Sequence, residues 1–507
     1  MTKTKRIQIL CLLGAVTLLL SGCWTEAPVE SANGLLGDQE PADQQEEVIL
    51  PAAFTLPYDP DQTLDPVTCA DGMQQVAGSL IYEGLFRLDR QLEPQPWLCQ
   101  SYTYDAASLT YTFTLRSGVT FSDGSPLTAA DAAATPRRAK SSQRYSARLA
   151  HVAAVSAGDG VVIVTLSRPD SSLPALLDIP IVKSGTEESL TPVGTGPYYF
   201  TTDEAGACLA SHSGWWRGES RPAERIALSA ARDREAILYQ FSSHEVQLIT
   251  ADLIGTEPIT ATGNISYEDA DTTVLQFLGF NTARAPFQDS AARRALGLGI
   301  NRETLVSAVL SGHARAAQFP VSPVSPLYPA ELESLYSYDD FAAAMEAAGL
   351  NTGRTRTVTL LVNQENTFKV SAAEHIAQAL SDFDLQIQVE ALPWEEYAAA
   401  LAAGNFDLYY GEVRLPANWD LSALVGTGGS LNYGGWADPQ TEQLLAACAA
   451  AEDRAAALSD LCAYLQQQAP ILPLCFKSSS VLYQTGAVSG LTPTAAEPFY
   501  DLPSCQI

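Results

Sequence analysis

The spacing of apolar and polar residues predicts a mixture of strands and helices over most of the chain. Residues 109–116 alternate apolar and polar side chains, and 161–166 are rich in valine, as expected of strands with a buried face. Residues 290–310 have the pattern of a helical pair. Further on, strands are expected to alternate with helices: 358–362, 372–383, 385–389, 394–403 and 406–410. Because such alternation forms parallel units, this part is expected to be an α/β lobe with a partly parallel sheet.

Two further features of the pattern concern helix boundaries. Thr128 and Asp131 have the spacing of a capping box, in which two side chains satisfy the first free N–H groups of a helix. Pro136 follows eight residues after the cap, where a proline is expected to bend or end the helix. A long helix rich in alanine, leucine and glutamine is expected over 441–468, followed by a last strand at 480–483.

The first residues have the pattern of an export signal. Lys3, Lys5 and Arg6 precede an apolar run of 14 residues, which is shorter than the ~20 that a helix needs to cross a bilayer. The run ends in Leu-Ser-Gly-Cys at 20–23, which resembles the bacterial lipobox, whose cysteine is diacylated and becomes the new amino terminus. We therefore expect 1–22 to be a lipoprotein signal peptide and Cys23 to be the lipid anchor. The alternative is an ordinary secretory signal with a chance cysteine.

Composition and charge limit the classes of fold and partner. Residues 23–50 hold seven acidic residues and no lysine or arginine, which predicts an extended, flexible tether. The whole chain has 29 Lys+Arg against 58 Asp+Glu, so its acidic surface disfavours nucleic acid and anionic lipid as partners. An apolar content of 46% excludes global disorder, and the length predicts two or three lobes.

The cysteines give no metal or redox motif. Nine are present, and setting aside Cys11 and Cys23 leaves seven that are scattered, with no C-x-x-C pair and no spacing suited to zinc. We expect them to be small buried residues, with one or two disulfides whose pairing the sequence does not give.

Motifs for catalysis are also missing. His244 and Glu245 begin like a zinc-protease helix, but Leu248 stands where the second histidine belongs. Residues 428–432 lack the second glycine of a nucleophile elbow. No enzyme activity, catalytic residue, metal site or cofactor is therefore expected. Aromatic residues in turns, which either line a ligand cleft or pack in the core, are Trp215, Trp216, Tyr409, Tyr410, Trp419, Tyr433 and Trp436.

Eight segments, in order along the chain, together resemble the family 5 extracellular solute-binding proteins, the receptors of ABC importers for oligopeptides, dipeptides and nickel. They are 63–66 (Thr-Leu-Asp-Pro), 81–86 (Ile-Tyr-Glu-Gly-Leu-Phe), 113–131, 193–198 (Val-Gly-Thr-Gly-Pro-Tyr), 281–287, 293–302, 406–408 (Phe-Asp-Leu) and 470–474 (Pro-Ile-Leu-Pro-Leu). The resemblance implies an α/β, periplasmic-binding-protein-like fold of two lobes hinged over a ligand cleft. It also implies the division of the chain: lobe I at 51–82, 193–304 and 480–507, an extra subdomain at 83–192, and lobe II at 305–479.

The same resemblance implies where a ligand binds. In peptide-binding members the ligand backbone pairs with receptor main chain, and the corresponding segment here is Ala70, Asp71 and Gly72. An aspartate of lobe II holds the peptide's ammonium group, and Asp420, beside Trp419, is the best match; an N-cap for the residues that follow is the alternative. The tryptophan and glycine that usually follow the Asp-Leu strand are replaced by Gly-Glu-Val-Arg-Leu-Pro at 411–416, so specificity is expected to have changed. Arg414 is a candidate for a ligand carboxylate, with a surface ion pair as the alternative.

The sequence thus predicts a monomeric, non-enzymatic receptor outside the cytoplasm, held to the membrane by a lipid on Cys23. Its expected partners are a peptide or peptide-like ligand and the permease subunits of an ABC transporter. Alternatives are a receptor for a nickel chelate or another non-peptide solute, a sensory or adhesive surface lipoprotein without transport, and an exported hydrolase.

Overall fold

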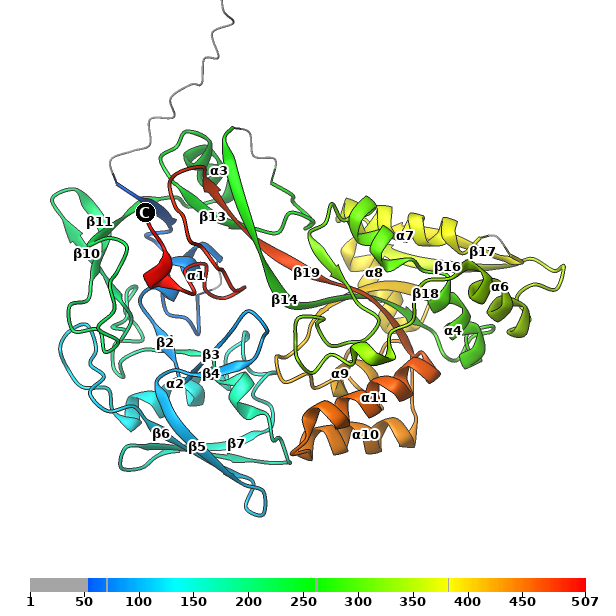
Figure 1. Ribbon diagram of the computed structural model, residues 1–507, viewed down its shortest axis with the longest axis horizontal. Coiled ribbons are helices and arrows are strands. Elements are labelled where there is room, and N and C mark those ends of the chain that lie inside the picture. The colour runs from blue at the N-terminus through cyan, green and yellow to red at the C-terminus, as the bar shows by residue number, and fades with distance from the viewer. Residues whose placement is uncertain (1–52, 70–71, 260–262, 382) are drawn as a thin grey trace, which may run out of the picture. The chain divides into compact units, whose positions relative to one another are not determined.

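The computed structural model describes residues 53–69, 72–259, 263–381 and 383–507 (Figure 1). The chain from Leu50 to Ile507 forms one compact unit. The expected signal peptide (1–22), lipid anchor (Cys23) and tether (23–50), as well as Ala70 and Asp71, lie outside the described residues.

The first of three larger sheets has four strands and a small hydrophobic core. Strand β1 is parallel to β12, and β12, β11 and β10 follow antiparallel. This core contains four fully buried side chains, Leu56, Tyr198, Leu209 and Ile226. The elements are β1 (Thr55–Tyr58), α1 (Gly72–Ser79), β10 (Tyr198–Asp203), β11 (Gly206–Ser211), β12 (Arg225–Ala230) and α3 (Arg234–Ser242).

The second sheet is antiparallel and forms within residues 83–192. Its strands lie in the order β5-β6-β8-β7, and stacked Tyr104, Tyr111 and Phe113 line one face. The elements are β2 (Glu83–Gly84), β3 (Phe86–Leu88), β4 (Pro94–Pro96), β5 (Cys99–Asp105), β6 (Thr110–Leu115), α2 (Ala129–Ala139), β7 (Val152–Ala157), β8 (Val161–Leu166), the 3-10 turn η1 (Leu173–Leu176) and β9 (Pro180–Ile181).

Helix α2 confirms one prediction and corrects another. Thr128 and Asp131 form the capping box. Pro136 does not end the helix, which continues to Ala139. The proline gives up one main-chain hydrogen bond, but the helix is held by tertiary packing, because Ala132, Ala133, Pro136 and Ala139 are all buried.

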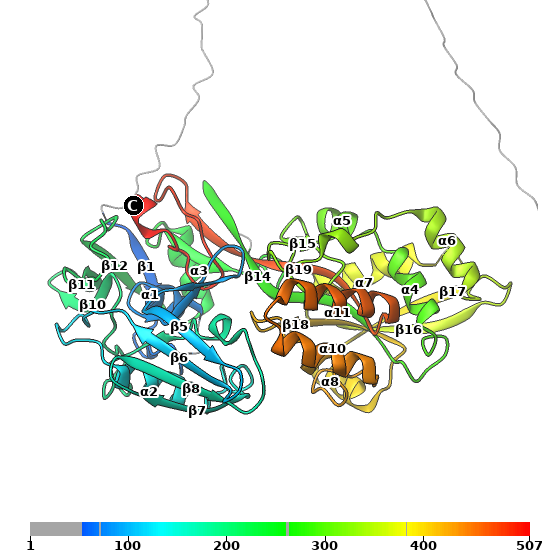
Figure 2. The ribbon, with the colours of Figure 1, turned by 60° about the horizontal axis from the view of Figure 1, so that its bottom comes forward.

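The third sheet has seven strands and contains the expected parallel units. Its order is β13-β19-β14-β18-β16-β17, with β15 paired to β19; β16 is parallel to both β17 and β18. The strands are β13 (Leu248–Ala251), β14 (Ile265–Phe280), β15 (Ala314–Ala316), β16 (Arg356–Asn363), β17 (Leu385–Leu392), β18 (Leu408–Arg414) and β19 (Ile471–Gln484). In both ribbon views, β14 and β19 run side by side between the part that contains β10–β12 and the part that contains α4–α11 (Figures 1 and 2).

Helices cover both faces of this sheet. They are α4 (Ser290–Leu298), α5 (Arg302–Thr304) with the π-helical turn η2 (Leu305–Val309), the 3-10 turn η3 (Ala330–Leu332), α6 (Tyr338–Ala347), α7 (Thr367–Ala379), α8 (Trp394–Ala403), α9 (Ser422–Val425), α10 (Pro439–Ala450) and α11 (Arg454–Gln468). The terminal 3-10 turn η4 (Leu502–Ser504) packs instead in the core of the first sheet.

Two expected boundaries near the C-terminus are wrong. The single helix expected over 441–468 is two helices, because Ala451 is extended and Asp453 caps a new helix by accepting from the N–H of Ala456. The last strand begins at Ile471 rather than 480 and passes through Pro473, which lies next to a register irregularity where its missing N–H is tolerated.

The expected disulfides are also wrong. Cys99, Cys208, Cys448, Cys462, Cys475 and Cys505 are buried free thiols, so no two of these six form a disulfide. Several lie in different hydrophobic cores, so their sulfur atoms cannot meet; Cys99, Cys475 and Cys505 belong to three separate clusters. Burial raises the pKa of Cys475 to about 12, which keeps this thiol protonated and unreactive.

A buried carboxylate fixes residues 83–192 against the first sheet. Glu83 is 6% exposed, and its Oε1 accepts hydrogen bonds from the indole N–H groups of Trp97 (2.9 Å), Trp215 (3.0 Å) and Trp216 (3.2 Å). Its Oε2 accepts from Thr195 Oγ1 (2.7 Å). Burial raises the pKa of Glu83, and these donors oppose the rise. The two tryptophans at 215–216 are therefore donors to an internal carboxylate.

Candidate ligand-binding site

The parallel strands of the third sheet indicate where to look for a ligand. Ligands of open α/β sheets bind outside the carboxyl ends of the strands. Here β16 ends at Asn363 and β18 ends at Arg414. Arg414 is the last residue of β18, and the segment that follows carries Trp419 and Asp420; all three were predicted from the sequence to bind ligand.

Asp420 is already paired with a cation from residues 83–192, the part of the chain that forms the second sheet. Its Oδ2 accepts a hydrogen bond from Arg168 Nη2 at 2.7 Å, and His151 Nε2 lies 3.9 Å away. Burial and the neighbouring Arg168 lower the pKa of His151, so at neutral pH Arg168 is the partner that carries charge. The side chains of Arg168 and Asp420 are 40% and 28% exposed, which leaves the pair open to exchange with other partners.

Asp420 also makes the local turn that the alternative interpretation suggested. Its Oδ1 accepts from the N–H of Ser422 at 2.9 Å. The N-cap position of α9 is Leu421, however, and no side chain caps this helix. One oxygen of Asp420 is thus used by the turn, and the other faces Arg168.

Trp419 is a core residue with a special backbone conformation. It is 2% exposed and packs edge-on against Phe476, with 6.0 Å between ring centres. Its φ of 55° is in the left-handed region, which is unusual for a large side chain and marks a site where the surrounding structure holds a strained turn. This turn buries the indole and places Asp420 beside Arg168.

A small cavity lies at this junction. It has a volume of about 20 Å³ and is lined by, among others, His151, Arg168, Asp170, Asn418, Trp419 and Asp420. Such a volume holds about one water molecule, not a peptide. A ligand can therefore reach Asp420 only when the contacts around this cavity separate.

The contacts around the cavity join residues 170–171 to 418–451. The main-chain N–H of Ser171 donates to the carbonyl of Ala449 at 2.9 Å, and its hydroxyl donates to the carbonyl of Ala451 at 2.7 Å. Asn418 Nδ2 donates to Asp170 Oδ2 at 3.2 Å. Together with the Arg168–Asp420 pair, these bonds hold the expected extra subdomain directly against the expected lobe II.

Arg414 lies apart from this cavity. It is exposed at the end of β18, and its guanidinium makes no hydrogen bond or ion pair to any residue of the described ranges. Burial lowers the pKa of Arg414, and the nearby carboxylates of Glu412 and Asp252 oppose the fall, so the alternative of a surface ion pair keeps support from these two residues. An unpaired guanidinium is a ready partner for a carboxylate.

A charged network that the sequence analysis missed lies beside Arg414. Glu412 Oε2 is 3.2 Å from Lys369 Nζ and 3.3 Å from Lys477 Nζ, and Lys477 also pairs with Asp252. Burial would raise the pKa of Glu412, but the two lysines outweigh it and hold the pKa below its usual value. The departure from the family pattern at 411–412 was a signal for Glu412; nothing in the sequence marked the lysines, which come from distant elements.

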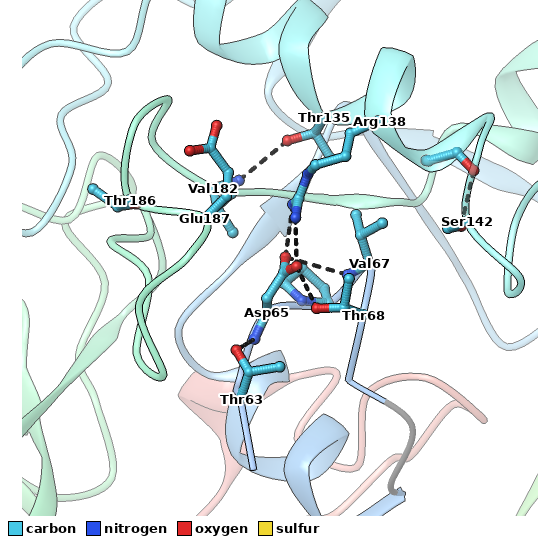
Figure 3. A network of polar contacts seen from close by, with 12 residues as sticks. Thr63, Asp65, Val67, Thr68, Thr135, Arg138, Ser142, Val182, Thr186 and Glu187 are labelled. Carbon is cyan, nitrogen blue, oxygen red and sulfur yellow. Dashed lines mark hydrogen bonds and ion pairs between the residues drawn. The ribbon is translucent and has the colours of Figure 1, made fainter.

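Gly72 begins α1, is exposed and does not line the cavity. The segment that precedes it is anchored to α2, as Figure 3 shows. The fully buried Asp65 carboxylate accepts from Arg138 Nη1 at 2.5 Å and Nη2 at 2.7 Å, and from Thr68 Oγ1 at 2.7 Å. A bidentate pair of this kind fixes the loop that leads into the predicted pairing residues.

A larger cavity is present elsewhere. It has a volume of about 690 Å³ and lies among α4, α6, α11 and residues 316–336. None of the residues predicted to bind ligand lines it.

Comparison with known proteins decides the family. The model of the bacterial extracellular solute-binding proteins, family 5, matches residues 93–432, which is more than half of the chain. The chain belongs to this family. It is thus a solute-binding protein of the kind that serves ABC importers, and the family is one of binding proteins rather than of enzymes.

Individual relatives agree with this assignment. The glutathione-binding protein GsiB of Salmonella paratyphi A is 27% identical over 355 residues, which are 66% of this chain and 69% of GsiB. A nickel ABC transporter structure from Bacillus halodurans matches with a TM-score of 0.73 at 20% identity, covering 88% of this chain and 97% of that one. The oligopeptide-binding protein AppA of Bacillus subtilis, solved with a nonapeptide, matches with a TM-score of 0.60 at 18% identity, covering 90% and 98%. These structures confirm the two-lobe α/β fold.

Two further kinds of feature are absent from the described ranges. No helix there is both long and apolar enough to cross a bilayer. No group of three or more His, Cys, Asp or Glu side chains in the same part of the chain is arranged to hold a metal ion.

Proposed function

We propose that this family 5 protein is a lipid-anchored receptor that captures a peptide or peptide-like solute between two lobes and delivers it to an ABC permease. The anchor is the lipid on Cys23, and the tether at 23–50 gives the receptor reach from the membrane. As in other hinged receptors, the ligand would signal its presence by favouring the closed state through its contacts with both lobes.

One observation supports a peptide-like ligand. The last residue of β18 and the segment after it present two groups of opposite charge, six residues apart in the sequence, that match the two ends of a zwitterion. The carboxylate of Asp420 suits a ligand ammonium. The guanidinium of Arg414 makes no direct hydrogen bond or ion pair in the described ranges, although Glu412 and Asp252 lie near it, and it suits a ligand carboxylate. In this proposal Ala70, Asp71 and Gly72 pair with the ligand backbone, and Trp419 fixes the turn that presents Asp420. The relatives' ligands, glutathione and a nonapeptide, are of this chemical class.

Native mass spectrometry of the detergent-solubilised full chain, expressed in a peptide-rich host, tests the proposal. We expect a set of short peptides or peptide-like zwitterions to copurify and to be identified after denaturing release. A protein that carries a metal chelate or another solute without both charged ends would contradict it. So would a protein that retains nothing when offered short peptides at millimolar concentration.

Replacing Arg414 with glutamine is expected to weaken binding of peptides with a free carboxylate by roughly 10- to 100-fold, because a hydrogen bond to a charged group contributes about 1.5–3 kcal/mol. Carboxy-amidated peptides should bind the variant and the unaltered protein equally. Titration calorimetry with matched acid and amide peptides measures the difference.

Arg354→Gln is the matched control, since Arg354 is an exposed arginine before β16 and lines neither of the two cavities described above. Equal losses for the acid and the amide in Arg414→Gln would remove the role assigned to Arg414.

A further inference from the structure

The loop at 168–171 offers lobe II the same groups that a bound peptide would offer. Arg168 gives Asp420 a cationic N–H donor at 2.7 Å. Three residues on, the main-chain N–H of Ser171 donates to the carbonyl of Ala449 at 2.9 Å. An extended peptide is captured by the same two interactions: its cationic group pairs with the aspartate, and its main chain forms hydrogen bonds with the main chain of the receptor.

The contact between Arg168 and Asp420 is weak enough for another cation to replace Arg168. Arg168 makes one hydrogen bond to the carboxylate instead of the bidentate fork that Arg138 makes to Asp65. Its Nε is buried and has no hydrogen-bond partner in the described part of the chain. The pair is also partly open to solvent, so its loss costs little.

The two cations cannot share the site. The cavity beside Asp420 has a volume of about 20 Å³, too small for a ligand ammonium to lie beside the guanidinium, and Oδ1 already accepts from the N–H of Ser422. A ligand ammonium can thus reach Asp420 Oδ2 only by displacing the guanidinium.

We propose that Arg168 is an internal surrogate for the ligand's ammonium group, and that a ligand must replace it on Asp420. The proposal rests on the role of Asp420 in the proposed function. It makes Arg168 a specificity-determining residue: a solute with a cationic group can replace Arg168 on Asp420, whereas a solute without one leaves the Arg168–Asp420 pair in place and binds more weakly. Arg168 also keeps the ligand-free receptor closed at this junction, because its ion pair with Asp420 holds Ser171 in place to donate to the carbonyl of Ala449.

The test compares Arg168→Gln with the unaltered full chain in detergent, using alanine peptides of two to five residues, each with a free or an acetylated amino terminus. We expect the variant to bind the free-amine peptides about two- to fivefold more tightly, as removal of a competing exposed ion pair allows, with no change for the acetylated ones. Hydrogen exchange in the absence of peptide should show the Ser171 amide exchanging faster in the variant.

Two further variants are controls. Arg168→Lys keeps the cation and should behave as the unaltered protein. Arg225→Gln breaks an ion pair of similar exposure, with Asp203 between β12 and β10, and should change neither affinity nor Ser171 exchange.

The outcomes separate the two proposals. Unchanged or weaker binding of free-amine peptides by Arg168→Gln would show that Arg168 is not a competitor, while the receptor function stands. Unchanged exchange at Ser171 would overturn its role in closing the junction. Failure of every peptide to bind any form of the protein would instead reject the proposed function, and the surrogate with it.

Discussion

Replacing Glu83 with alanine is expected to lower the free energy of unfolding by about 3–5 kcal/mol, because it leaves several buried donors without an acceptor. Three indole N–H groups and one hydroxyl donate hydrogen bonds to this carboxylate. The donors come from residues 97, 195 and 215–216, on both sides of the predicted boundaries of the extra subdomain. The loss should appear as a lower urea midpoint, followed by tryptophan fluorescence, which reports these same indoles.

Trp216→Phe is the matched control for this prediction. It keeps the ring while removing one donor, and Glu83 keeps Trp97, Trp215 and Thr195, so a loss of about 1 kcal/mol is expected. If Glu83→Ala unfolds within 1 kcal/mol of the unaltered protein, the carboxylate is not what fixes this junction.

Replacing Asp420 with alanine is expected to weaken binding of peptides with a free amino terminus by roughly 30- to 150-fold, because a desolvated ammonium loses about 2–3 kcal/mol with its carboxylate partner. Amino-acetylated peptides should lose far less, since they bring no charge to this site. Calorimetric titration of each peptide in free and acetylated form measures the selectivity directly.

The control for Asp420 is Asp203→Ala, which removes the carboxylate from the exposed pair with Arg225. Equal weakening of free and acetylated peptides by Asp420→Ala would mean that Asp420 acts by holding Arg168 and the junction rather than by binding the ligand. That result would contradict the proposal that Asp420 binds the ammonium group of the ligand.

Much of the chain's local structure followed from its pattern. Alternating side chains predicted β6 and a valine-rich run predicted β8, and the order of strands and helices after residue 358 predicted the parallel strands β16, β17 and β18. The predicted helix at 394–403 has the bounds of α8. The errors at Pro136, at 451–453 and at Pro473 share one cause, since in each case tertiary packing or pairing outweighed a local preference.

The candidate site divides in the same way. The resemblance to the family marked Asp420, with Trp419 beside it, and the departure from the family pattern at 411–416 contained Glu412 and Arg414. The sequence could not mark Arg168, which meets Asp420 across 252 residues, or Lys477, which meets Glu412 from another strand.

By itself, the sequence determined the family, the fold class and the chemical types of the residues that serve a ligand. Spacing, charge and short motifs are local properties, so one chain is enough to read them. Only the tertiary structure decided which groups these residues face: three indole N–H donors on Glu83, Arg168 on Asp420, and the carboxylates of Glu412 and Asp252 near Arg414. Those pairings depend on where distant segments of the chain are brought together, and the interaction of two charges depends on their separation and burial rather than on their order in the sequence.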